Sequence, residues 1–136
     1  EPCWAKLLGD HSSAELHKFS NRQETIRISS WSKILAFADH EAFAIYDSRT
    51  AISLNIALKQ TSISERFFMP PSRNKIVAQA SQILSHNREM INHGYQSYLN
   101  LLQAFVTAQC AKSVLDAEQT LFANAPRLAA SFVENS

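Results

Sequence analysis

The chain has 136 residues, the size of one domain, and is long enough to bury a core without help from metals or disulfides. Its 46% hydrophobic and 18% charged residues argue against disorder, and its net charge of +1 lacks the basic excess of a dedicated nucleic-acid-binding domain. No apolar run reaches the ~18–20 residues that span a bilayer, and no signal peptide is visible, so we expect no membrane association.

The few cysteines limit the class of protein further. Cys3 and Cys110 are too few for a disulfide framework, so the cytoplasm is the expected location. No Cys and His residues have the spacing of zinc ligands, and we expect neither a metal nor another cofactor. Since the chain begins at Glu1 rather than Met, whether an N-terminal portion is missing stays open.

In chain order, a capping-box pattern at residues 12–15 predicts a short helix that ends near residue 19. Apolar positions at helical spacing predict a second helix over residues 29–38. The apolar run 43–46 is either extended or a single turn. Asp47 stands where the N-cap of a third helix, over residues 48–58, is expected.

The remaining chain is also predicted to be mostly helical. After a loop over 61–73, one apolar stripe runs through residues 74–109, with Gly94 as the point where it divides or kinks. Ser113 begins a capping pattern for a helix to about residue 123, and Pro126 suits the first turn of a last helix. The predicted fold is all-α, a compact bundle of five to seven helices forming a single domain over residues 1–136.

One segment, residues 28–55, has an order suited to chemistry: a helix with an early lysine, a turn, a short apolar run, an aspartate and a new helix. This order resembles part of the core of the helix-hairpin-helix base-excision DNA glycosylases. The Ser-Lys-Ile-Leu sequence containing Lys33 stands at the place of the family's lysine, and Ala-Ile-Tyr-Asp, ending in Asp47, at that of its aspartate. The chain has no glycine at 27–31, where the family's hairpin is glycine-rich.

The resemblance implies DNA binding with glycosylase or AP lyase chemistry. Lys33 would attack the sugar C1′ as a neutral amine, release the base and leave a Schiff base. Asp47 would stabilise the positive charge that develops on the sugar. Arg27, Ser32 and Arg49 would contact double-stranded DNA while the target base is flipped into a pocket. A minimal enzyme and an inactive relative that retains the scaffold both fit this segment.

Simpler roles fit the same residues. Lys33 can be a solvated lysine, Asp47 only an N-cap, and Arg49 the partner of a carboxylate or of water. A second functional hypothesis is a non-enzymatic helical interaction module that forms a homodimer through the apolar face of residues 74–109. The surplus of nine basic over five acidic residues in 18–75 favours a polyanionic partner, but an ordinary fluctuation explains it as well.

Overall fold

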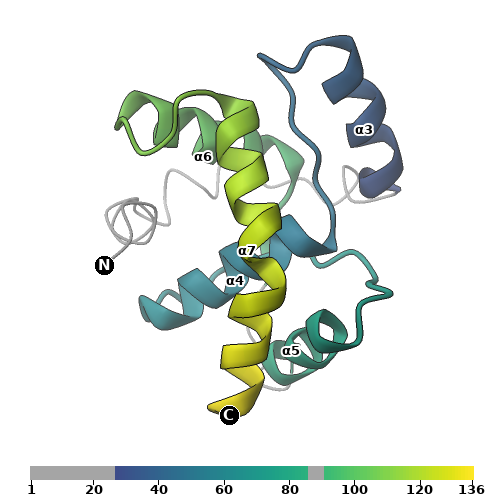
Figure 1. Cartoon of the computed structure of the whole chain (residues 1–136), viewed down its shortest axis with the longest axis vertical. Coiled ribbons are helices and arrows are strands. Elements are labelled where there is room, and N and C mark those ends of the chain that lie inside the picture. Colours follow the sequence, from purple (N-terminus) through teal and green to yellow (C-terminus); the bar gives the residue numbers. More distant parts are fainter. Residues whose placement is uncertain (1–26, 86–90) are drawn as a thin grey trace.

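The computed structural model describes residues 27–85 and 91–136, so the helix predicted near residues 12–19 lies outside the described residues. The described part is all-α, as predicted (Figure 1). Its five helices are α3 (Ile28–Ala38), α4 (Ser48–Gln60), α5 (Lys75–Ser85), α6 (Tyr95–Thr107) and α7 (Val114–Glu134).

Helix α4 is the centre of the fold. Its nine consecutive residues 50–58 are all buried, as expected for a helix with neighbours on every side. Leu54 and Leu58 pack with α6 and the first half of α7, whereas Ile52 and Ile56 pack with α5 and the second half of α7. Figure 1 shows α7 lying across α4, with α6 and α5 toward its two ends. Two apolar clusters therefore share one central helix.

The C-terminal residues form one helix where two were predicted. Ser113 caps α7 as expected, its hydroxyl accepting the Asp116 N–H, but the helix continues through Pro126 to Glu134. Proline lacks an N–H, so the carbonyl of Phe122 loses its usual helical donor. The expected break is wrong because buried residues on both sides of the proline, Leu121 and Ala129 among them, pack against the core.

Residues 74–109 do not form one helix. α5 ends at Ser85, and α6 begins after Gly94, its N-cap, so the interruption ends at the predicted glycine but begins nine residues before it. The apolar residues of α6, including Tyr98 and Leu102, are buried within this chain. The apolar face of α6 is therefore used for packing within the chain, while a homodimer through residues 74–109 stays a prediction.

A short parallel strand pair, β1 (Arg66–Phe67) and β2 (Ile91–His93), lies among the helices. Asn55 of α4 holds β1: its side-chain amide donates to the Phe67 carbonyl at 3.0 Å and accepts the Phe67 N–H at 2.7 Å. The sequence predicted only a loop here, since pairing over two or three residues leaves no periodic signal.

Two further observations concern helix length and the state of a cysteine. None of the described helices is both long and apolar enough to cross a lipid bilayer. Cys110, just after α6, is disulfide-bonded, which the small number of cysteines did not predict. The other cysteine of the sequence, Cys3, lies outside the described residues.

Candidate functional site

The segment that leads to Asp47 is extended, which decides between the two conformations predicted for residues 43–46. Side chains, rather than the backbone of a neighbouring strand, form hydrogen bonds with its backbone groups. The hydroxyls of Tyr95 and Tyr98 donate to the carbonyls of Ala44 and Ile45, both at 2.8 Å. The Ile45 N–H donates to a carboxylate oxygen of Glu118 at 2.6 Å. The buried polar backbone is thereby paired without a sheet.

Three tyrosines form the support behind this segment. Tyr46 meets the ring of Tyr98 edge-on, with centroids 5.0 Å apart, and that of Tyr95 at 6.3 Å. Burial raises the pKa of Tyr95 to about 12, although its bond to Ala44 lowers the pKa, and raises those of Tyr46 and Tyr98 further. The three hydroxyls therefore stay neutral donors at physiological pH, and the aromatic residues of α6 belong to the core.

Asp47 is the N-cap of α4, as predicted. Its Oδ1 accepts the N–H groups of Arg49 and Thr50, both at 3.1 Å. Thr50 completes a capping box, because its hydroxyl accepts the Asp47 N–H at 3.1 Å. The carboxylate is thus held by the first turn of α4, whose exposed N–H dipoles favour its negative charge.

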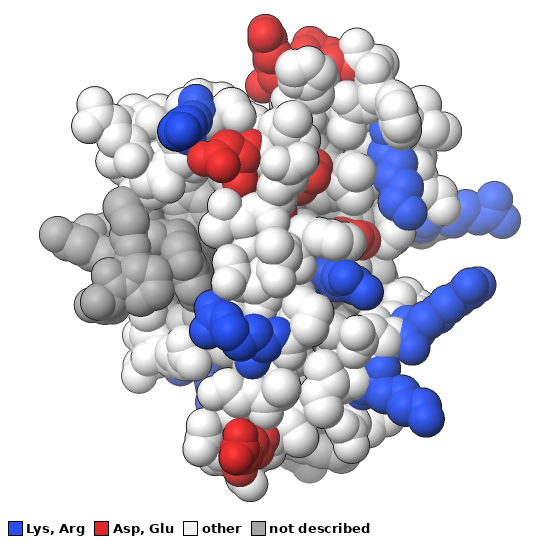
Figure 2. Space-filling model, viewed as in Figure 1, with Lys and Arg blue, Asp and Glu red and all other residues white. Residues whose placement is uncertain are grey.

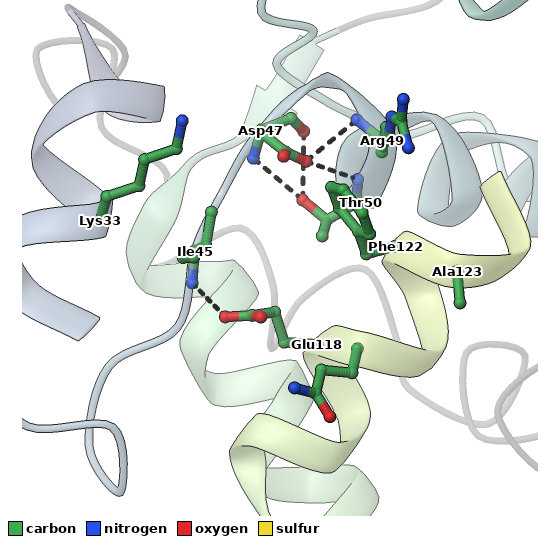
Figure 3. A pocket seen from close by; sticks show the side chains of 9 residues that line it. Lys33, Ile45, Asp47, Arg49, Thr50, Glu118, Phe122 and Ala123 are labelled. Atoms are coloured by element: carbon green, nitrogen blue, oxygen red, sulfur yellow. Dashed lines mark hydrogen bonds between the residues drawn. The ribbon is translucent and has the colours of Figure 1, made fainter. Parts of the chain in front are cut away.

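Lys33 and Asp47 line the same open pocket, of about 670 Å³ (Figure 3). Lys33 reaches in from α3, and Asp47 stands at the start of α4 on the other side of the hollow. The lysine side chain is exposed and the aspartate half-buried. The pocket lies between α3, the extended segment, α4 and α7, and is lined by Lys33, Ile45, Asp47, Arg49, Thr50, Glu118, Gln119, Phe122 and Ala123.

Arg49 also lines the pocket, but its partner differs from either one considered from the sequence. Its guanidinium lies 4.8 Å from the ring centroid of Phe122, a cation–π contact with α7. Phe122 is 39% exposed, so the stacked pair remains partly open to solvent. The pocket therefore has a flat aromatic and guanidinium surface on its α7 side.

Glu118 is the pocket residue that the sequence analysis missed. It lies on α7, is only 7% exposed and contacts the extended segment through Ile45. Burial raises its pKa, the bond from Ile45 lowers it, and the charge of Asp47 raises it. Its position about one turn into the helix predicted after Ser113, among the apolar residues Val114, Ala117 and Leu121, was the signal that could have marked it.

Arg27 and Ser32 are placed differently from the other predicted site residues. Arg27 is exposed at the N-cap of α3 and adopts the left-handed conformation, with φ 54° and ψ 30°. Ser32 is fully buried, and its hydroxyl accepts the Tyr46 N–H at 3.0 Å. A direct contact between Ser32 and DNA is therefore corrected to a structural role: this hydroxyl joins α3 to the extended segment.

The described residues contain no group of three His, Cys, Asp or Glu side chains placed to hold a metal ion. The polar and aromatic groups in the pocket lining are an amine, a guanidinium, two carboxyl groups, a hydroxyl, an amide and one aromatic ring. Comparison with protein-family models, curated proteins and solved structures gives no match to this chain.

Proposed function

We propose that this protein binds DNA and acts on abasic or damaged nucleotides as a helix-hairpin-helix glycosylase or AP lyase would, with Lys33 as the nucleophile. The observation that carries the proposal is the opening of Lys33 and Asp47 into one solvent-accessible pocket. A Schiff-base mechanism needs an amine and a stabilising negative charge near the same sugar carbon.

The size and lining of the pocket support this reading. A volume of about 670 Å³ is within the range of sites that take small organic ligands. The open face of Phe122 and the guanidinium of Arg49 offer a surface on which an unstacked base can stack. Asp47 supplies the negative charge toward which positive charge on the sugar would develop.

The charge on the surface supports a polyanionic partner. Figure 2 shows many of the Lys and Arg side chains of one face along the edge where α3 and α5 lie. Asp47 occupies the free N–H groups at the start of α4, so phosphates would be held by side chains such as those of Arg27 and Arg49. The left-handed Arg27 also gives the turn before α3 a conformation that glycine adopts most readily.

Reductive trapping tests the proposed chemistry. The intact protein is incubated with a duplex containing one abasic site and sodium borohydride, and a covalent adduct is expected by gel electrophoresis. Lys33→Ala should abolish the adduct, whereas the matched control Lys112→Ala, an exposed lysine outside the pocket, should retain it. Failure of the wild-type protein to form any adduct with this duplex would exclude Schiff-base chemistry.

Duplex binding is tested separately, since an inactive relative would still bind. Affinity for the abasic duplex is expected to fall steeply with salt, and Arg49→Ala should weaken it and lower the slope of log K against log salt by about one unit. Gln96→Ala, an exposed residue on α6, serves as the control. Absence of binding at low salt would remove DNA as the partner.

A protein partner is the second candidate, and one observation favours it. Phe37 and Ile34, on one face of α3, are 92% and 68% exposed. Such side chains are typical of interaction surfaces. A dimer by light scattering that becomes monomeric in Phe37→Ser and ignores duplex DNA would support this function over the first. It would place the contact on α3 and not on residues 74–109.

A cytoplasmic location is part of the proposal, and the state of Cys110 tests it. Disulfides are rare in the cytoplasm because thiol reductants keep cysteines reduced there. Alkylation of thiols in intact cells followed by mass spectrometry should find Cys110 modified if the protein is cytoplasmic. An unmodified, disulfide-bonded Cys110, as in this structure, would point to an oxidising compartment.

A further inference from the structure

We propose that Glu118 is the acid–base residue of the pocket and exchanges a proton with the atoms that react at Lys33, while Asp47 acts as a fixed negative charge. This inference rests on the proposed function and assigns a role in it to a residue from the opposite end of the chain. Two carboxyl groups that line one pocket would then have separate roles.

The geometry leaves one oxygen of Glu118 available. Oε1 accepts the Ile45 N–H at 2.6 Å, which holds the carboxyl group in place. Among the described residues Oε2 has no hydrogen-bond partner, and the side chain lines the pocket together with Lys33 and Asp47. In Figure 3 the carboxyl group of Glu118 lies beside Ile45 at one end of the extended segment, and Lys33 lies on the opposite side of this segment. A bound ligand can therefore reach this oxygen.

The two carboxyl groups have different surroundings. Asp47 receives two backbone N–H groups at a helix N-terminus, whereas Glu118 receives one and is almost fully buried. Burial and the nearby charge of Asp47 both raise the pKa of Glu118. The other titratable groups around Glu118 are Tyr95 and Tyr98 on α6, with Lys33 and Arg49 at the pocket wall. Opposed environments for two acids are the usual sign of separate acid–base roles.

The proposed reaction takes place at an abasic site in DNA. The lone pair of the Lys33 amine forms a bond to C1′ of the ring-opened sugar, the C=O π electrons move to oxygen, and one proton passes from nitrogen to that oxygen. The carboxylic acid of Glu118 then protonates the hydroxyl formed, the C–O bond breaks, and water leaves. The nitrogen lone pair forms the iminium ion beside Asp47, and Glu118, now a carboxylate, regains a proton from water.

A pH–rate profile tests this role with an abasic duplex and sodium cyanoborohydride as the trapping reagent. Glu118→Gln keeps an oxygen for the Ile45 N–H but cannot donate a carboxylic proton. We expect trapping to be slower by roughly 10²-fold, the lower end of the effect of general acid catalysis. The decline of the wild-type rate as pH rises through the Glu118 titration should also disappear. Glu134→Gln, the same change at an exposed glutamate of α7 outside the pocket, is the control.

The outcomes separate the two proposals. An adduct that forms with the same rate and pH profile in wild type and Glu118→Gln overturns the role of Glu118 and leaves the lyase function standing. No wild-type adduct overturns both. If circular dichroism shows that Glu118→Gln is unfolded, a titration of the wild-type protein still tests the role of Glu118. Carbon-13 NMR of its glutamate carboxyl groups should show one that titrates above the ordinary range, and Asp47→Asn should lower that pKa. An unshifted titration contradicts the inference.

Discussion

The two walls of the pocket are built in different ways. Helix α4 and α7 form one wall, in which Asp47 and Glu118 are held by backbone hydrogen bonds over a buried core. Helix α3 forms the other, and of its described side chains only Ile28 and Ser32 are buried. The acids are thus fixed by the core, whereas the lysine depends on a thinly packed helix. A site made in this way is preorganised on its acidic side and adjustable on its amine side.

Truncation of an apolar side chain should give the largest difference in the free energy of unfolding between the two walls. Leu54, in α4, is fully buried, and Leu54→Ala should lower the free energy of unfolding by about 2–5 kcal/mol because it leaves a cavity. Ile34→Ala in α3, where the side chain is 68% exposed, should change it by less than about 0.5 kcal/mol. Urea unfolding followed by circular dichroism measures both. Equal losses would mean that α3 is packed as tightly as α4.

Ser32→Ala tests the bond that joins α3 to the rest of the site. It leaves the buried Tyr46 N–H without its acceptor, so we expect a loss of about 1–3 kcal/mol in urea unfolding. Because Lys33 is the next residue, trapping of abasic DNA should fall as well, under conditions in which the variant is folded. Ser29→Ala, in the first turn of the same helix, is the matched control and should change neither measurement. A stable Ser32→Ala would show that α3 is held by other contacts.

Arg27→Gly tests the start of α3, where the backbone is left-handed. The left-handed backbone costs a non-glycine residue roughly 1–2 kcal/mol, so glycine should raise the free energy of unfolding by up to about 1 kcal/mol. The same change removes a cation proposed to contact phosphate and should weaken duplex binding. We therefore expect the free energy of unfolding to rise and the affinity for duplex DNA to fall. Unchanged affinity would exclude Arg27 from the DNA contact while leaving the backbone argument intact.

The pH dependence of stability tests the acidic wall. The pKa of Glu118 is raised in the folded protein above its ordinary value of 4.5, so this group favours folding below pH 4.5. That contribution is lost as pH rises through the folded pKa. The stability of the wild type relative to Glu118→Gln should therefore decrease from pH 4 to pH 7, measured by thermal unfolding. A difference that is constant with pH would contradict the raised pKa.

Local patterns predicted those parts of the fold that local chemistry decides. The cap at Asp47, the division at Gly94 and the helix over residues 28–38 each depend on a few neighbouring residues. Pro126 was misjudged because contacts of α7 with α4 and α5, distant in sequence, hold the helix through it. Glu118 was missed for the same reason: its partner Ile45 is 73 residues away. Lys33 and Asp47 were found as a pair because both lie within one short segment.

The origin of the pocket lining has a consequence for partial forms of this protein. Part of the lining comes from residues 33–50 and the rest from 118–123, so a product that stops before α7 has lost Glu118, Phe122 and much of the surface that covers α4. Such a fragment would keep the lysine and the aspartate in its sequence but would lack the α7 side of the pocket. Any activity proposed for this pocket therefore depends on α7, and a fragment that stops before this helix should form no adduct with abasic DNA.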